Sequence, residues 1–289
     1  MCIMNGILIV DKEVGYTSRD VVNIISKELG TKKVGHTGTL DPMASGVLVV
    51  CVGKALKVSE LITSYDKEYI ARVRLGYETD TLDNEGIIVK SSEFREIIRD
   101  EILDTLNKFV GNIKQEVPKY SAIKVNGKKL YEYARNGIDV ELPVKDVSIY
   151  SLELVSDIEY VNGYYEFDIR CLVSKGTYIR SLVRDIGVNL GTYATMIGLR
   201  RIKQGKFDIN ESYTLDDVRN GKYKMLNISE VLDIGKVVVD EDMAFRVKNG
   251  QVLDKFFDDD MVMVLNNNQD LLAIYEQAND GKVKPWKVF

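Results

Sequence analysis

Residues that build metal centres and disulfide frameworks are scarce in this sequence. Its 289 residues include a single histidine, His36, and three cysteines, Cys2, Cys51 and Cys171. An odd number of cysteines without CxxC spacing argues against a disulfide framework or a structural zinc site. With one histidine in the whole chain, we expect no metal site.

Familiar nucleotide, metalloprotease and esterase motifs are missing as well. The sequence has no GxxxxGK[ST], no GxGxxG between a strand and a helix, no HExxH and no GxSxG. No segment reaches the ~18 consecutive apolar residues of a membrane span, and MCIMNGILIVDKEVG lacks the features of a signal peptide. We therefore expect a cytoplasmic protein, not associated with a membrane, whose chemistry needs no cofactor.

The net charge is only −5, but it is unevenly distributed. Residues 207–289 carry a net −6, so residues 1–206 carry +1. Basic residues gather within 168–206 and in KVNGKKLYEYAR, where they alternate with tyrosines. Local basic patches with aromatic residues are typical of RNA binding. Composition leaves an alternative open, in which these basic residues only form solvated faces of helices and bind no RNA.

Strand and helix patterns mix without a strict βαβ rhythm. Apolar or alternating runs predict strands at 6–12, 46–53, 67–76, 147–155 and 164–174. In 67–76 the alternation places Tyr69 on the buried face and Lys67 among the polar residues. Helical spacing predicts helices at 19–29 (capped by Thr17 or Ser18), at 91–111, and from Thr177 onward. The mixture favours an α+β fold with a mixed or antiparallel sheet.

The pattern of apolar and turn-forming residues changes after about residue 230. Short apolar runs, KVVV, MVMVL and LLAIYE, alternate with the turn-rich segments KNGQ, NNNQD and NDGK. Such spacing predicts a small β domain that docks on a larger one. We expect two domains, residues 1–230 and 231–289.

One short segment, GHTGTLDPMASG at 35–46, carries an acid on a glycine-rich bend. Pro42 biases Asp41 away from helical backbone, and the neighbouring glycines allow close approach of a ligand. An ionised aspartate held this way can act as nucleophile, general base or electrostatic partner. The alternative is that Asp41 only caps a turn through its own backbone.

The same segment resembles the signature loop of the TruB-type pseudouridine synthases. It matches that pattern at Gly35, His36, Gly38, Leu40, Asp41, Pro42, Ala44, Gly46 and Leu48. Four further blocks resemble the family in the same order: NGILIVDKEVGYTS, DKEYIARVRLGYETDTLDNEG, VPKYSAIKVNGKKLYEYARNG, and SKGTYIRSLVRDIG with LRR. Glu13 departs from a proline usual in the family.

The resemblance implies a fold and an activity. The fold is a pseudouridine synthase catalytic domain with a mixed, largely antiparallel sheet flanked by helices, followed by a small PUA-like RNA-binding domain. The activity is conversion of the uridine at tRNA position 55, in the T loop, to pseudouridine. The nucleotide leaves its stack, the N-glycosidic bond breaks, and C5 joins the ribose without a cofactor.

The resemblance also assigns roles to single residues. Asp41 is the catalytic carboxylate, acting at the ribose as nucleophile or base, although addition to C6 stays open. His36 fills the place that the base vacates, Tyr69 stacks on the base, and Arg180 pairs with Asp41. Tyr178 and Leu199 complete the pocket. Contacts with the RNA backbone are expected from Lys12, Lys124, Lys128, Lys129, Arg135, Arg200 and Arg201, several of them in an RNA-facing insertion at about 117–137.

Two other functions remain open at this point. One is an RNA-binding or tRNA-folding module that does not depend on Asp41. The other is a carboxylate-dependent hydrolase of a small molecule, which would need neither aromatic stacking nor basic faces around its pocket. For the isomerase, we expect the T arm of tRNA as partner, no obligatory protein partner, and a monomer.

Overall fold

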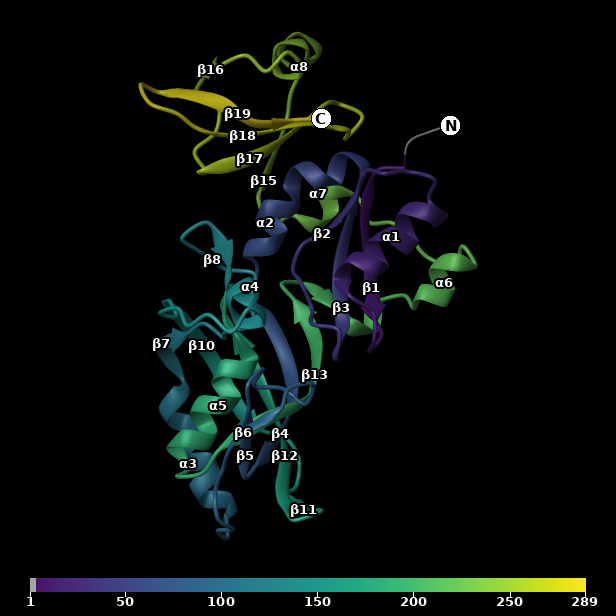
Figure 1. The fold of residues 1–289 in the computed structure, drawn as a ribbon. Helices are drawn as coiled ribbons and strands as arrows, with labels where there is room; N and C mark the ends of the chain where they lie inside the picture. The colour runs from purple at the N-terminus through teal and green to yellow at the C-terminus, as the bar shows by residue number, and fades with distance from the viewer. Residues whose placement is uncertain (1–3) are drawn as a thin grey trace.

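The computed structural model describes residues 4–289, which form one large and one small β-sheet with helices on their faces (Figure 1). The main path of the large sheet runs β1 (Gly6–Lys12), β3 (Ala44–Val52), β13 (Ala194–Gln204), β4 (Lys67–Leu75), β12 (Tyr164–Val173), β10 (Val144–Leu154) and β7 (Gly111–Glu116). Short strands β2 (Val34–His36), β11 (Glu159–Val161) and β14 (Phe207–Asp208) pair beside this path. Within residues 4–289, β3 and β13 are the one parallel pair of named strands in the large sheet, so the predicted mixed, largely antiparallel sheet is confirmed.

Helices cover the two halves of the large sheet separately. α3 (Arg99–Phe109) and α5 (Ile179–Asn189) pack with β4, β10 and β12 around one apolar core. α1 (Ser18–Glu28) and α6 (Leu215–Arg219) pack on β1 and β3 around another. Thr17 caps α1 by accepting from the N–H of Asp20, as one of the two predicted caps. β3 and β13 join the halves, and the segment that carries Asp41 lies at that junction.

The helix predicted at 91–111 is shorter than expected. It begins at Arg99, and Phe94 and Ile98 are exposed. Phe94 packs on Tyr160 and Tyr165, with ring centroids 5.7 and 6.0 Å apart, because the β11–β12 hairpin lies beside it. Phe94 thus packs on a neighbouring strand pair, a contact that a local pattern does not show.

Strand β4 alternates strictly between buried and partly exposed residues. Tyr69 lies on the buried face as predicted, but Lys67 lies on it too, at 7% exposed. The Lys67 Nζ donates to the carbonyl oxygens of Thr63 and Tyr65, the former at 2.7 Å. These local acceptors at the end of α2 (Ser59–Ser64) allow the ammonium to be buried.

The last residues form a five-stranded sheet at the top of Figure 1. Its strands are β15 (Gly235–Val238), β17 (Met261–Leu265), β18 (Leu271–Gln277), β19 (Lys282–Val288) and β16 (Leu253–Asp254), with α8 (Glu241–Lys248) on one side. The three predicted strands are present, whereas α8 and β19 were not predicted. Met263, Leu265 and Ile274 share a core with β1, β3, α2 and α7 (Ile228–Val231), which docks this sheet on the larger one.

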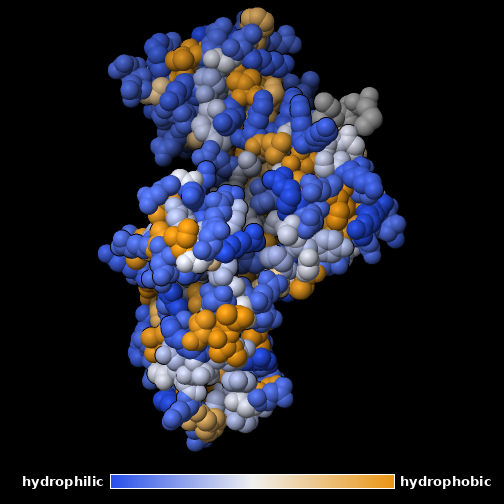
Figure 2. Space-filling view, in the orientation of Figure 1, coloured by the Kyte–Doolittle hydropathy of each residue, from blue (hydrophilic) through white to orange (hydrophobic). Residues whose placement is uncertain are grey.

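Smaller elements surround the segment that carries Asp41. The insertion at 117–137 contains β8 (Lys124–Val125), β9 (Lys128–Lys129) and α4 (Leu130–Arg135). A hairpin pairs β5 (Tyr77–Thr79) with β6 (Ile88–Ser91), and turns of 3-10 helix occur at Gly53–Val58 and Ile209–Glu211. Figure 2 shows a mainly hydrophilic face with separate apolar patches, one of them low in the view where β6 exposes apolar side chains.

Two of the three cysteines lie in the described part of the chain. Cys51 and Cys171 are free and buried, and burial raises the pKa of both thiols to about 12. Cys2 lies outside the described residues. Among residues 4–289, no helix is long and apolar enough to cross a lipid bilayer.

Candidate active site

The backbone on both sides of Asp41 is held by hydrogen bonds from α1 and β1. The Ser18 hydroxyl donates to the carbonyl oxygen of Leu40 at 3.1 Å and accepts from the Leu40 N–H at 2.9 Å. The carbonyl oxygen of Pro42 accepts from the Gly15 N–H at 2.8 Å and from the Lys12 Nζ at 3.4 Å. The residue before Asp41 and the residue after it are therefore both fixed to neighbouring elements.

Strand β13 holds the remainder of the same loop. Arg201 Nη2 donates to the carbonyl oxygen of Gly38 at 3.1 Å, and Gln204 Nε2 to that of Thr37 at 3.1 Å. Gly46 has a φ of +104°, and a Cβ added there would lie 2.1 Å from the Arg201 carbonyl oxygen. Only glycine fits that approach. These contacts explain physically why a glycine-rich segment forms a rigid bend.

Arg180 and Asp41 form an ion pair, with Nη2 3.1 Å from Oδ2. The arginine side chain is 8% exposed and the carboxylate 37% exposed, so the buried cation orients an acid that still reaches the solvent side. Ion pairs of this kind, made through a buried guanidinium, are directional and hold the carboxylate in one orientation.

Arg180 also pairs with a second carboxylate, which was not predicted from the sequence. Asp83 Oδ2 lies 3.3 Å from Arg180 Nη1, and Asp83 is almost fully buried. Its Oδ1 accepts from the Thr81 hydroxyl at 2.6 Å and from the Glu85 N–H at 3.1 Å. Because the segment TDTLDNEG was interpreted only as a turn-rich loop, its three acids offered no signal that one of them turns inward.

A pocket of about 390 Å³ opens in front of Asp41. It is large enough to receive a nucleotide, and its walls come from the Asp41 loop, β4, the insertion, α5 and β13. Of the predicted site residues, it brings together Asp41, Tyr69, Tyr178, Arg180 and Leu199. It also includes Tyr120, Ser121 and Tyr131 from the insertion, for which no pocket role was predicted.

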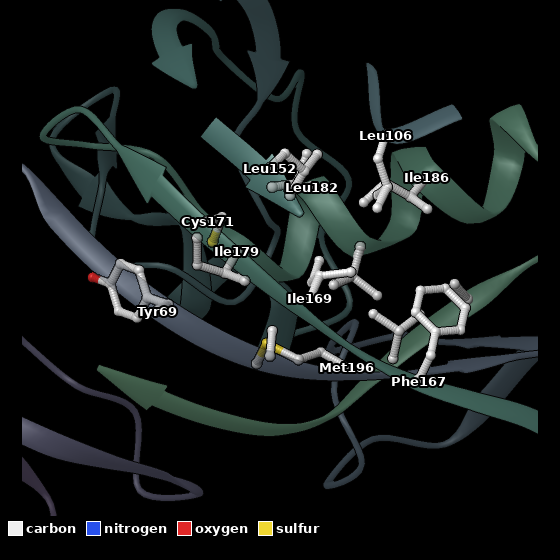
Figure 3. Close-up of a cluster of buried hydrophobic side chains, with 14 of the residues drawn as sticks. Tyr69, Leu106, Leu152, Phe167, Ile169, Cys171, Ile179, Leu182, Ile186 and Met196 are labelled. Atoms are coloured by element: carbon white, nitrogen blue, oxygen red, sulfur yellow. The ribbon is translucent and has the colours of Figure 1, made fainter. Parts of the chain in front are cut away.

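Tyr69 lies where the apolar core meets this pocket. Figure 3 shows its ring at the edge of the cluster, with the hydroxyl pointing away from the labelled apolar side chains. Burial raises the pKa of Tyr69, so its phenol stays protonated at neutral pH. Leu199, on the neighbouring strand β13, adds an apolar surface to the same pocket.

Tyr178 is the residue immediately before α5, and its backbone is held on both sides. Its N–H donates to Gln115 Oε1 at 2.7 Å, and its carbonyl oxygen accepts from Gln115 Nε2 at 3.1 Å. Gln115 is buried on β7. This amide fixes the start of the helix that carries Arg180, a role that sequence reasoning missed because an isolated glutamine has no pattern.

His36 does not line the pocket. It is half-buried at the end of β2, where Nδ1 accepts from the Gly38 N–H at 3.4 Å. Burial, together with the charges of Arg19 and Arg201, lowers the pKa of His36, so the ring is neutral at pH 7. Of the predicted site residues around the target base, His36 is thus one that the pocket does not include.

Two of the predicted contacts to the RNA backbone need correction. Lys12 and Arg201 are 0% and 1% exposed, and both donate to carbonyl oxygens around the Asp41 loop. Their charge was interpreted as phosphate-binding because sequence does not show burial. In the structure they hold the loop that carries Asp41.

The other predicted basic residues fall into two groups. Within residues 4–289, Lys124, Lys128, Lys129 and Arg135 of the insertion form no ion pair, although Lys129 and Arg135 lie against the Tyr131 ring. Arg200 instead binds Asp11 through both Nη atoms, at 3.1 and 2.7 Å. The insertion therefore carries positive charge that no ion pair in the described part of the chain compensates. Most of the basic run at 168–206 is paired with acids.

No cluster of three or more histidine, cysteine, aspartate or glutamate side chains within residues 4–289 is arranged to hold a metal ion. The polar groups at Asp41 are instead a guanidinium, phenols and backbone carbonyls. They suit an organic substrate with hydrogen-bonding edges and a flat ring.

Comparison with known proteins gives full-length relatives and structural neighbours. Residues 26–179 match the TruB family pseudouridylate synthase (N terminal domain), and residues 180–240 the tRNA pseudouridylate synthase B C-terminal domain. The chain is 43% identical to tRNA pseudouridine synthase B of Staphylococcus saprophyticus over 99% of both chains. It is 40% identical to the protein of that name from Caldanaerobacter subterraneus, again over 99% of both.

Solved structures agree in fold. A chain of an H/ACA RNP bound to a substrate RNA containing 2′-deoxyuridine is similar with a TM-score of 0.72 and 25% identity, over 98% of this chain and 84% of that one. A chain of a Cbf5-Nop10-Gar1 complex gives 0.70 and 25%, over 98% and 83%.

The fold, with its carboxylate pocket, defines a pseudouridine synthase, which is an isomerase. Within that class, the chain belongs to the TruB family of pseudouridylate synthases. The resemblance in the sequence blocks is thereby confirmed as a family relationship over the whole chain.

Proposed function

We propose that this enzyme converts the uridine at position 55, in the T loop of tRNA, to pseudouridine, with Asp41 as its catalytic carboxylate and without a cofactor. The observation that carries the proposal is the Asp41–Arg180 pair at the wall of a pocket that also contains Tyr69. Relatives of 40–43% identity, named tRNA pseudouridine synthase B, support tRNA as the substrate.

The reaction breaks N1–C1′ and forms C5–C1′, and the hydrogen on C5 leaves to solvent while N1 gains one. The uracil is everted and lies between the Tyr69 ring and the Leu199 side chain, because stacking on the protein replaces the stacking that the base leaves behind in the RNA. Asp41 acts at the ribose, by attack on C1′ or by removing a proton from C2′. The Tyr69 phenol, held protonated by burial, assists proton transfer at C5.

RNA binds across the insertion and the pocket. Lys124, Lys128, Lys129 and Arg135 contact phosphates, and Arg200 contributes less because Asp11 compensates its charge. His36 occupies the position vacated by the base, and Tyr178 borders the nucleotide from the start of α5.

We also propose the domain division at residues 230 and 231. Residues 1–230 form the catalytic domain, and residues 231–289 a small PUA-like module that contacts RNA with few residues, since the C-terminal part of the chain is acidic. We propose that the enzyme acts on the T arm as a monomer, without an obligatory protein partner. A tRNA substrate supports a location in the cytoplasm, away from membranes.

The test uses unmodified tRNA transcript labelled with tritium at uridine C5. The purified protein should release tritium without added metal or cofactor, and carbodiimide mapping should find one pseudouridine, at position 55. Release at another position would refute the assigned site. An RNA-binding module independent of Asp41, or a small-molecule hydrolase, would release none.

A further inference from the structure

Arg180 makes two contacts that its pairing with acids does not explain. Nη1 donates to the carbonyl oxygen of Thr81 at 3.0 Å, and Nη2 donates to that of Tyr120 at 3.2 Å. Thr81 belongs to the 79–87 loop, which carries Asp83, and Tyr120 lies near the start of the RNA-facing insertion. A single guanidinium therefore joins the catalytic carboxylate, this loop and the insertion.

The loop and the insertion are also joined directly, by Tyr120 and Asp80. The Tyr120 hydroxyl donates to Asp80 Oδ2 at 3.0 Å, while Asp80 Oδ1 accepts from the Ile87 N–H at 2.9 Å. Burial, with the hydrogen bond and charge of Asp80 adding to it, raises the pKa of the Tyr120 phenol, so it keeps its proton and donates. Gly86 packs so closely that an added Cβ would lie 2.4 Å from Asp80 Oδ1.

The basic part of the insertion is attached to the same short segment. The Tyr131 N–H donates to the carbonyl oxygen of Ser121 at 3.1 Å, and the Leu130 N–H to that of Ile123 at 2.8 Å. α4, with its cationic neighbours, is thus bonded to the residues that follow Tyr120. A displacement of the insertion by RNA reaches Tyr120, and through its carbonyl oxygen reaches Arg180.

We infer that Tyr120 and Asp80 are a positioning pair, which docks the RNA-facing insertion on the 79–87 loop and so keeps Arg180 aligned with Asp41 when RNA is bound. The inference rests on the proposed function. Tyr120 borders the pocket, but its hydroxyl is bound to Asp80, so the pair is assigned a positioning role and no contact with the reacting atoms. Their hydrogen bond acts on the rate through Arg180, which contacts both segments and the catalytic carboxylate.

The experiment compares five variants on C5-tritiated tRNA: Tyr120→Phe, Asp80→Ala, their double mutant, Asp80→Asn, and Tyr133→Phe. Asparagine at 80 is the conservative replacement, because its oxygen accepts from Ile87 and its amide donates to the Tyr120 hydroxyl. Tyr133 is the matched control in the same insertion, since its hydroxyl donates to the carbonyl oxygen of Val125 at 3.0 Å. Single-turnover rates, RNA dissociation constants, thermal unfolding, and hydrogen exchange in segments 79–87 and 117–137 are measured.

Loss of the hydrogen bond should slow single turnover about 10-fold in Tyr120→Phe and in Asp80→Ala, with RNA affinity changed by less than about 3-fold. The double mutant should be no slower than the slower single mutant. Hydrogen exchange should rise in both segments of Tyr120→Phe, while Asp80→Asn and Tyr133→Phe keep rates within about 2-fold of the wild type.

An unchanged rate in Tyr120→Phe, or rate losses that multiply in the double mutant, would overturn the inference. So would a loss confined to RNA affinity. A wild-type protein that releases no tritium would instead refute the proposed function, and the exchange measurement would still report whether the pair joins the two segments.

Discussion

Arg180 Nη2 lies 3.1 Å from Asp41 Oδ2, and the same guanidinium contacts Asp83 and the carbonyl oxygens of Thr81 and Tyr120. Four partners around one planar group leave it a single arrangement. The position of the Asp41 carboxylate is therefore defined from its cationic side by α5, in addition to the hydrogen bonds that hold its own loop.

Replacing Arg180 by lysine should lower the single-turnover rate constant about 100-fold or more. Lysine keeps the charge, but its compact ammonium cannot reach the four partners in the geometry of a guanidinium. Single-turnover tritium release measures the loss, with thermal unfolding to show that the variant folds. A rate within about 3-fold of the wild type would mean that a positive charge alone suffices and that the planar geometry of the guanidinium is unimportant.

Two substitutions of Tyr69 should distinguish its stacking on the base from its part in proton transfer. Tyr69→Leu removes the ring and should lower kcat/KM by about 10- to 100-fold, since base–aromatic stacking contributes ~1–3 kcal/mol. Tyr69→Phe keeps the ring, so its KM should stay close to that of the wild type while kcat falls. Steady-state kinetics on the same tRNA decide between them, and equal effects of leucine and phenylalanine on KM would contradict stacking at this position.

The insertion should account for much of the salt dependence of RNA binding. Replacing Lys128 and Lys129 together by alanine should weaken binding and reduce the slope of log K against log salt by roughly 1.5. The matched control is the double alanine replacement of Lys222 and Lys224, which are exposed after α6 and, within residues 4–289, form no ion pair. Should both pairs change the slope equally, the insertion would have no special role.

The lowered pKa values of two buried lysines predict that the stability of the protein rises with pH just above neutrality. Burial lowers the pKa of Lys12 and of Lys67 from 10.5 to about 8. Between these values the unfolded chain binds protons that the folded protein has released, so the free energy of unfolding increases with pH. Above pH 9 the buried thiols of Cys51 and Cys171 act in the opposite direction, because their folded pKa is raised to about 12.

Urea unfolding at pH 7.5 and 8.7 tests this effect in the wild type and in Lys67→Met. The stability of the wild type relative to the variant should increase across the interval by up to ~1 kcal/mol. A difference that stays flat or falls would contradict the lowered pKa of Lys67.

The class of fold could be predicted from the sequence, and so could the site residues that stand in a characteristic local pattern. Asp41 stands on a proline- and glycine-marked bend, which made it a candidate without coordinates. Tyr69 was selected through the family resemblance of its block, since an alternating strand alone predicts only a buried tyrosine. Asp83 and Gln115 could not, because their importance arises from contacts with α5, which lies about 60 to 100 residues away along the chain. Lys12 and Arg201 were misassigned since charge was interpreted as exposure.

The same limit applies to the helix at Arg99. The spacing of Phe94 and Ile98 is compatible with a helix, but the helix begins at Arg99 and Phe94 packs on the β11–β12 hairpin. Tertiary contacts overrode a local periodicity there, whereas the strongly amphipathic α1 and α5 followed it.

The most direct test of the account is tritium release from C5-labelled tRNA by the wild type and by Asp41→Asn under identical conditions. Asparagine preserves the size of the side chain and an oxygen for Arg180, while it removes the charge and the nucleophile. We predict release by the wild type, none above background by the variant, and RNA affinity within about 3-fold of the wild type. Release by both proteins would contradict the assignment of Asp41 as the catalytic carboxylate.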